Sequence, residues 1–312
     1  MSDKFQVFID TDESRRVYME DKEHISASAL TRIRHTCAAK WKFEERSAVK
    51  STKPLAARAC LLDQDHFERD YFRLPDPADF ENALVTAKDM QAYLKDKGIK
   101  GGSGKTVSEL VEMCRAANPH VHIMSEIMDR AIQFNAGRIP VTASDYDEVL
   151  QMRHAIFQNE EISELLYGGH PEVSLFGELL GVKVKIRYGV LTTGGDIVDY
   201  GTAASVNPEE FPMVAYKMGK LMKMALQHDA FQSAYGEKPR SVNVLAQEGK
   251  APFIPHLFEM DEDALRIGRI QYSSALATYR HCLETDSWPA YGSRSKFNLP
   301  EWLVKKYEGP KL

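Results

Sequence analysis

Cysteine is scarce in this sequence, and long apolar runs are missing from it. The 312 residues include only four cysteines, which are widely spaced and form neither a CxxC pair nor a zinc-binding pattern. This pattern excludes a disulfide framework, and we expect buried thiols in a reducing cytoplasm. The apolar runs are far shorter than the roughly 20 residues that cross a bilayer. No apolar core of a signal peptide follows Met1, so we expect a cytoplasmic protein that does not enter a membrane.

A surplus of positive charge is also missing. The formal net charge is −5 at pH 7, which excludes a polycation that binds nucleic acid over its whole surface. Apolar residues make up 43% of the chain and charged residues 27%, as in ordinary globular proteins and unlike disordered ones. The sequence therefore predicts a folded protein in which any contact with a polyanion is local.

Two different periods of apolar residues divide the chain. The first half has helical periodicity, which predicts helices at 24–45, 57–72, 86–97, 107–116, 123–135 and 143–158. Strict alternation then appears in GVKVKIRYGVL (181–191), and IVDY (197–200) follows the glycine turn TTGGD, so we expect a β-hairpin there. The remaining elements are expected in this order: a helix at 209–231, strands at 240–247 and 252–260, and a helix at 260–284.

This order of elements predicts an α+β (α/β) fold. A mixed central sheet flanked by helices should occupy residues 166–312, and a helical N-terminal elaboration should occupy residues 1–165. No linker rich in proline, glycine or serine separates the two parts, so we expect one structural unit.

Residues 85–117 contain the glycine-rich stretch GGSGKT between two predicted helices. It does not match a phosphate-binding loop, because position 99 is isoleucine where that motif has glycine, and no strand precedes it. The helix, loop and helix resemble instead a SAP-type DNA-binding module, with Gly98, Gly104 and Lys105 at matching positions. The resemblance implies that Lys105 contacts DNA, whereas a plain helical hairpin would produce the same pattern.

Asp199 lies on the second strand of the predicted hairpin, in DIVDYGTAAS, and Gly201 follows two positions later. Side chains alternate along a strand, so positions 199 and 201 share one face. An acid on such a strand, a second acid from a neighbouring strand and a lysine two residues after the first form the site of a metal-dependent nuclease. The acids hold Mg²⁺, and the metal and the lysine activate water and stabilise the pentavalent phosphate.

Six segments in the same order resemble the RecE-like (exonuclease VIII type) nucleases of phages and prophages. They are ISASALTRIRHTCAAKWKF, LAARACLLDQDHFERDYFRLP, EVSLFGELLGVKVKIRYGV, DIVDYGTAAS, VLAQEGKAPFIPHLFEM and YRHCLETDSWPAYGSRSKFNLPEW. The resemblance implies the restriction-endonuclease-like PD-(D/E)XK fold and the cytoplasm of a bacterial host cell. It also implies a ring-shaped homo-oligomer with DNA duplex ends as a ligand and a single-strand annealing protein as a partner.

The chain departs from this family at the positions that carry the chemistry. Glu172 and Asp199 match metal ligands of the family, but Gly189 and Gly201 stand where the family has an aspartate and a lysine. Arg58 stands at the family's N-terminal histidine, and its downstream glutamine falls near Met224. The resemblance therefore implies a pseudo-nuclease with Glu172 and Asp199 as remnants, a weak metal site if any, and no cofactor. If only two side chains were lost, restoring them should restore activity.

Several cations are expected to contact DNA in this interpretation. Lys183, Lys185 and Arg187 alternate along one strand face with position 189, and a cationic row with two acids suits a phosphate better than a metal. Arg58 and Lys105 complete the set. A solvent-exposed face of an edge hairpin explains the row of cations equally well.

Two other functions remain open from the sequence. The first is an active double-strand DNA exonuclease that uses Mg²⁺ or Mn²⁺, a relocated lysine and possible help from Glu178 as a metal ligand. The second is an interaction protein that inhibits a host factor through surfaces such as the acidic stretch 63–81. His120 and His122 in PHVHIM share a face if extended, but they lack a third metal ligand nearby.

Overall fold

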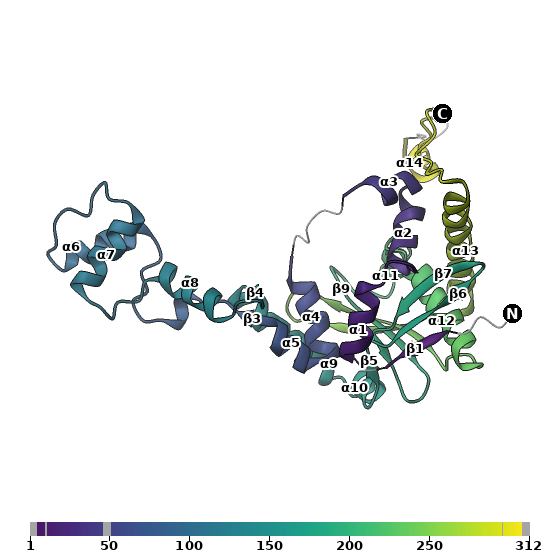
Figure 1. Ribbon diagram of the computed structural model, residues 1–312, viewed down its shortest axis with the longest axis horizontal. Helices are drawn as coiled ribbons and strands as arrows, with labels where there is room; N and C mark the ends of the chain where they lie inside the picture. Colours follow the sequence, from purple (N-terminus) through teal and green to yellow (C-terminus); the bar gives the residue numbers. More distant parts are fainter. Residues whose placement is uncertain (1–4, 10, 46–50, 295, 308–312) are drawn as a thin grey trace.

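Two β-sheets form the centre of the computed structural model, which describes residues 5–9, 11–45, 51–294 and 296–307 (Figure 1). The first sheet has the order β1-β6-β7-β2, with β1 at Gln6–Phe8, β6 at Ser174–Leu179, β7 at Val182–Arg187 and β2 at Ile25–Ser26. The second has the order β11-β10-β9-β8-β5, with β11 at Pro255–Glu259, β10 at Val242–Glu248, β9 at Ile197–Ala203, β8 at Val190–Leu191 and β5 at His170–Pro171. Parallel and antiparallel pairs occur in both sheets, so the predicted mixed architecture is confirmed.

The predicted strand 181–191 is divided between the two sheets at Tyr188 and Gly189. Backbone hydrogen bonds continue across the division, because Tyr188 N–H donates to Val173 O and Glu172 N–H donates to Gly189 O, both at 2.9 Å. A Cβ added to Gly189 would lie 2.5 Å from the carbonyl oxygen of Val198. Strand β9 therefore packs against this glycine more closely than a side chain permits.

The predicted hairpin is present but is shorter than expected. β8 and β9 pair antiparallel, with Val190 opposite Val198. The long alternating segment β7 pairs with β6 instead, a strand that the sequence did not predict. The alternation itself is confirmed, because Val182, Val184 and Ile186 are buried and the residues between them are more exposed.

Helices cover the sheets and bury one main core with them. Those of the body are α1 (Thr11–Glu20), α2 (Ala27–His35), α3 (Ala38–Phe43), α4 (Lys53–Leu62), α5 (Gln64–Asp70), α9 (Ala143–Phe157), α10 (Glu160–Leu166), α11 (Phe211–Lys217), α12 (Lys220–Tyr235) and α13 (Glu262–Thr285). A short helix, α14 (Glu301–Tyr307), lies near the C-terminus (Figure 1). Strands β1 and β2 and helix α2 join the same core as α12 and α13, whereas α4, α5 and α9 pack in a second cluster. Among the described residues, no helix combines the length and apolarity of a membrane span.

Three predicted helices are interrupted by local features. Residues 24–45 form α2 and α3 after β2, and residues 57–72 form parts of α4, α5 and a strand. The Asp63 side chain accepts the His66 N–H and so begins a new helix at α5. Residues 209–231 divide into α11 and α12 at Gly219, whose φ of +74° is a left-handed conformation that glycine adopts without strain.

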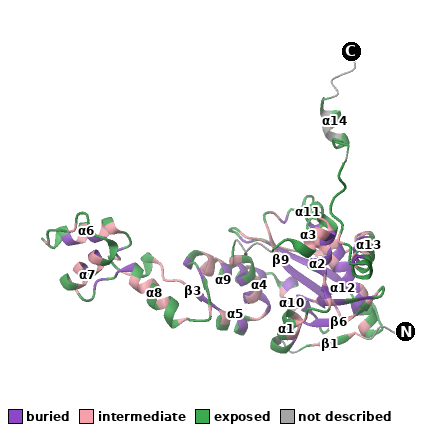
Figure 2. Ribbon diagram, turned by 45° about the horizontal axis from the view of Figure 1, so that its top comes forward, coloured by how far each residue is buried: buried purple, intermediate pink, exposed green. Residues whose placement is uncertain are grey.

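An arm projects from the body between α5 and α9 (Figure 1). Its neck is the parallel strand pair β3 (Tyr71–Arg73) and β4 (Ile139–Val141), and beyond the neck lie the 3₁₀ helix η1 (Pro77–Asp79), α6 (Ala87–Asp96), α7 (Val107–Ala117) and α8 (Met124–Phe134). The head of the arm has a small core of its own, formed by Leu84, Met90, Leu94, Leu110, Cys114, Val121 and Ile123. Figure 2 shows that buried residues are otherwise concentrated in the body.

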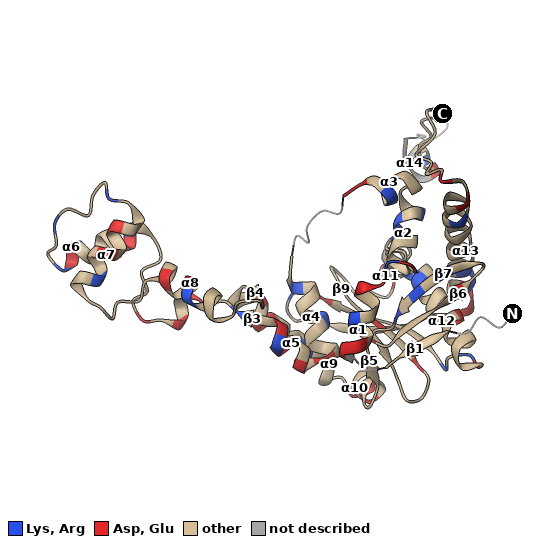
Figure 3. Cartoon of the chain, viewed as in Figure 1, with Lys and Arg blue, Asp and Glu red and all other residues tan. Residues whose placement is uncertain are grey.

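The head contains the helix–loop–helix that the sequence predicted at 85–117. Both helices begin with a capping box, Thr86 with Asp89 and Thr106 with Glu109, which explains why their starts were predictable. Figure 3 shows acidic and basic positions interspersed along the arm. The SAP-like role of this segment and the division of the chain at residue 165 stay predictions.

We expect Asp229→Asn to lower the free energy of unfolding by weakening the contact of α12 with α13. The effect should be smallest at acidic pH. Burial alone would raise the pKa of Asp229, but hydrogen bonds from His228, Arg269 and Tyr272 lower it to about 2. A lowered pKa stabilises the fold above the unfolded value of about 4, and that stability is lost as the pH falls towards 2. After allowance for solvent screening, the variant should lose about 1–2 kcal/mol at pH 7.

Urea unfolding at several pH values measures this effect. The difference between wild type and Asp229→Asn should shrink between pH 4 and pH 2. Asp263→Asn is the matched control, because Asp263 lies exposed in the first turn of α13. A difference that stays constant down to pH 2 would contradict the assigned role of Asp229.

Candidate functional site

A cavity of about 640 Å³ lies where α1, α2, α4, β7 and the start of α12 meet. Five Arg or Lys side chains line it and come from four elements: Arg15 from α1, Arg58 from α4, Arg187 from β7, and Lys220 and Lys223 from α12. Glu172 also lines this cavity, and Asp199 lies directly beneath the cations. The fold thus brings together the two acids predicted as remnants of a metal site.

Asp199 is fully buried and surrounded by positive charge. Its Oδ2 lies 2.8 Å from Lys220 Nζ, and its Oδ1 lies 2.6 Å from Lys223 Nζ and 3.4 Å from Arg58 Nη1. Burial alone would raise the pKa of Asp199, but Lys223, Lys220 and Arg58 hold it well below its usual range. Burial in turn lowers the pKa of Lys223 to about 8. Asp199 is therefore a carboxylate that neutralises neighbouring cations.

Glu172 is 5% exposed, and its carboxylate is also paired with cations. Its Oε1 lies 3.0 Å from Arg58 Nη2, and its other oxygen pairs with Arg187. Burial and the neighbouring arginines lower the pKa of Arg187 to about 10. Glu172 has a φ of +56°, which residues other than glycine adopt at a cost of about 1–3 kcal/mol. The Ser14 hydroxyl donates to its carbonyl oxygen at 2.7 Å and fixes this backbone.

Gly201 faces the ammonium group of Lys220. A Cβ added to Gly201 would lie 3.3 Å from Lys220 Nζ. A helix lysine therefore reaches the place where the side chain of position 201 would begin. Position 201 lacks the strand lysine, as predicted, and Lys220 from α12 places its ammonium group beside that position.

The contribution of α12 to the cavity was not predicted from the sequence. Lys220, Lys223 and Gln227 lie at helical spacing on one face, which is the one signal that could have found them. The glutamine was placed near Met224, but Met224 is buried in the main core. Gln227 lines the cavity instead, and its Nε2 donates to Arg187 O at 2.9 Å.

The other predicted residues lie apart from this cavity. Lys183 pairs with Glu23 at an exposed position, and Lys185 Nζ donates to Tyr18 O at 2.8 Å and lies 3.4 Å from Asp21 Oδ2. Lys105 pairs with Glu109 in the head of the arm at 2.8 Å. Glu178 stands opposite Lys183 in the β6–β7 ladder and does not line the cavity. The structure thus gathers Arg58 and Arg187 with the acids, and DNA contacts by the three lysines stay predictions.

The residues of the cavity do not fit a magnesium or manganese ion as they stand. Each carboxylate oxygen of Glu172 and Asp199 already has a cationic partner. Arg58, Arg187, Lys220 and Lys223 exceed the two carboxylates by about two charges, and Arg15 and Asp63, which also line the cavity, offset each other. Mg²⁺ requires free oxygen ligands instead. Within the described part of the chain, no three His, Cys, Asp or Glu side chains gather as a metal site. The excess of positive charge suits an anion.

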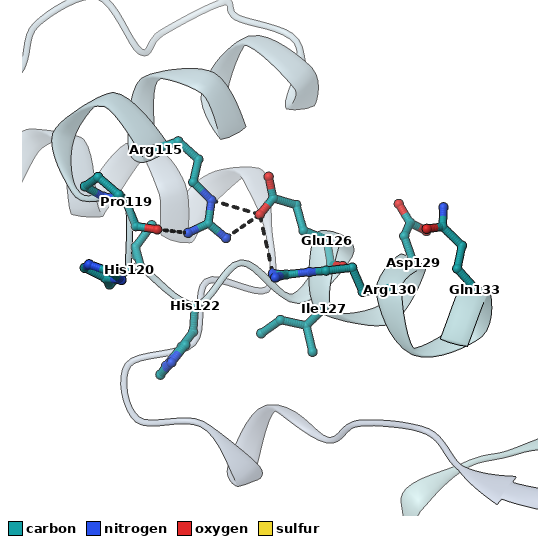
Figure 4. A pocket seen from close by; sticks show the side chains of 10 residues that line it. Arg115, Pro119, His120, His122, Glu126, Ile127, Asp129, Arg130 and Gln133 are labelled. Atoms are coloured by element: carbon teal, nitrogen blue, oxygen red, sulfur yellow. Dashed lines mark hydrogen bonds and ion pairs between the residues drawn. The ribbon is translucent and has the colours of Figure 1, made fainter. Parts of the chain in front are cut away.

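A second hollow of about 630 Å³ lies on the arm (Figure 4). There Arg115 pairs with Glu126 and donates to Pro119 O, while Arg130 also reaches Glu126. Figure 4 shows His120 and His122 pointing away from each other. This hollow therefore contains an ion-pair network and does not join the two histidines in a metal site.

The sheet, the helices and the position of the two acids define a PD-(D/E)XK nuclease-like protein. Residues 104–297, more than half of the chain, match the family described as "PDDEXK-like domain of unknown function", and the chain belongs to this family. The fold is also similar to the crystal structure of a protein from Eubacterium rectale named "Putative exonuclease". The TM-score is 0.52 at 11% identity, covering 96% of this chain and 97% of that chain. A comparison with curated proteins finds no match.

Proposed function

We propose that this chain is a pseudo-nuclease that binds DNA at the cationic cavity without cutting it. The observation that carries the proposal is the pairing of both predicted metal ligands with protein cations, which leaves positive charge in excess. Arg and Lys side chains arranged in this way bind phosphate groups. From the RecE resemblance we add duplex ends, a ring-shaped oligomer, an annealing partner and a role in phage-type recombination to the proposal.

One experiment tests binding and cutting together. Linear duplex DNA is incubated with the protein in Mg²⁺ or Mn²⁺ and examined for degradation, and a gel shift is recorded across salt concentrations. We expect a shift without degradation. Because the cations of the cavity exceed its carboxylates by about two charges, affinity should fall about 7- to 12-fold between 50 and 200 mM salt, since each neutralised phosphate charge releases a counterion. Lys220→Gln should flatten this salt dependence.

Two outcomes would contradict the proposal. Degradation that Lys220→Gln abolishes would establish an active exonuclease with a relocated lysine. Absence of a shift at low salt would favour an interaction protein that inhibits a host factor. The acidic stretch offers limited support for that function, because Arg69 and Arg73 neutralise part of it through Asp70 and Asp79.

The active exonuclease is the second candidate, and a specific observation favours it. Lys220 Nζ lies 2.8 Å from Asp199 and next to position 201, where a strand lysine was expected. A metal ion could then bind only if Arg58 and the two lysines released the carboxylates. Because a metal ion must first displace these cations, we rank the active exonuclease after the pseudo-nuclease.

A further inference from the structure

We propose that the cavity holds the terminal phosphate of a nucleotide, a phosphomonoester, and not an internal phosphodiester of a strand. This inference rests on the proposed DNA binding, and it specifies the ligand of the same cavity. Three features carry it: the net charge of the cation cluster, the hydrogen-bond donors that remain available, and the shape of the remaining wall.

The charge of the cluster matches a phosphomonoester. Arg58, Arg187, Lys220 and Lys223 exceed Glu172 and Asp199 by about two charges. A phosphomonoester has a charge of about −1.5 to −2 at pH 7, whereas an internal phosphodiester has one negative charge. The terminal group therefore neutralises the cavity, and the internal group leaves it positive.

Hydrogen-bond donors remain available around the cavity. Lys220 and Lys223 each donate one side-chain hydrogen bond, to Asp199, although an ammonium group has three N–H donors. The Arg187 guanidinium pairs with Glu172 through Nη2, and its buried Nε has no acceptor among the described residues. The first turn of α12 begins at Gly219, which offers no capping side chain to the free amides, and Gly219 lines the cavity. These donors can surround a phosphate with three terminal oxygens.

The rest of the wall suits the sugar and base of one nucleotide. It is formed largely by the apolar side chains Met19, Leu55, Leu62, Ile139 and Met218 and by the rings of Tyr18 and Tyr71. Met19, Leu55 and Met218 are about half exposed or more and lie at the mouth, whereas Asp199 is fully buried beneath the cations. A volume of about 640 Å³ accommodates one terminal nucleotide of a strand or of a duplex end and is too small for the full width of a duplex. A strand can thus enter only by its end.

The phosphomonoester can come from a strand end or from a free nucleotide, and one set of titrations separates them. Fluorescence anisotropy compares a short single strand with a 5′-phosphate, a 3′-phosphate or hydroxyl groups at both ends. Calorimetry measures dAMP binding. We expect one phosphorylated end to bind at least about tenfold more tightly than the hydroxyl strand, which is about 1.4 kcal/mol. Stronger binding of the strand than of dAMP identifies the strand end, and equal binding identifies the free nucleotide.

Lys223→Gln and Lys220→Gln should each remove the preference for the phosphorylated end. Lys217→Gln is the matched control, because Lys217 is an exposed lysine on the neighbouring α11 that does not line the cavity. Thermal unfolding of each variant verifies that it is folded. Equal binding of phosphorylated and hydroxyl strands would overturn this inference but leave DNA binding intact. Failure of every strand to bind would overturn the proposed function itself.

Discussion

Asp199→Ala is expected to destabilise the chain by about 3–5 kcal/mol. The substitution removes the single carboxylate that contacts Lys220, Lys223 and Arg58 together and leaves these cations facing one another. Breaking a buried ion pair from one side costs this much because the remaining charge is desolvated and unpaired. Urea unfolding followed by circular dichroism measures the change as a lower midpoint at pH 7.

A double variant isolates the electrostatic part of this loss. Asp199→Ala combined with Lys223→Met should be less destabilised than the sum of the two single variants, because the uncompensated cation has also gone. Asp129→Ala, an exposed acid on α8, should change stability by less than about 0.5 kcal/mol. A loss below about 1 kcal/mol for Asp199→Ala would show that the cation cluster does not depend on this carboxylate.

Gly189→Asp is expected to destabilise the chain by about 2–4 kcal/mol and to leave it without nuclease activity. The new Cβ would lie 2.5 Å from Val198 O and 3.2 Å from the Cα of Asp199, and both atoms belong to the backbone of β9. Overpacking and the burial of a new carboxylate both contribute to this cost. The sequence led us to expect that aspartate and lysine at positions 189 and 201 would restore cutting, but the structure has no room for the first of them.

The comparison that tests this expectation is Gly249→Asp, because a Cβ at Gly249 meets no atom within 4 Å. That variant should unfold at nearly the wild-type urea concentration. Gly189→Asp with Gly201→Lys should unfold much earlier and should not degrade linear duplex DNA in Mg²⁺. Degradation by this double variant would show that the site has lost only two side chains and that β9 can move to admit them.

The sequence predicted the parts of the fold that local patterns determine. Alternation in residues 181–187 revealed β7, and helical periodicity at 107–116 revealed α7. β6 was missed because its SLFGEL stretch is buried at three consecutive positions and so lacks a period of two. The break at Gly219 was missed because the apolar period continues across it.

The site was predictable only where one strand carries it. Asp199 stood out because its strand resembles a nuclease strand, and Glu172 followed from the order of segments. The ion pairs of Asp199 with Lys220 and Lys223 join residues 21 and 24 positions apart on different elements. Only the packing of α12 against β9 determines them, and no local pattern encodes that packing.

The narrow neck of the arm bears on how the head can change in evolution. β3 and β4 lie side by side, so the points where the backbone leaves and re-enters the body are separated by only about two strand spacings. Because the head has its own core and is attached through two adjacent strands, insertion or deletion can exchange it while the cavity keeps its shape. Relatives that share the body can therefore differ in what they carry at the tip.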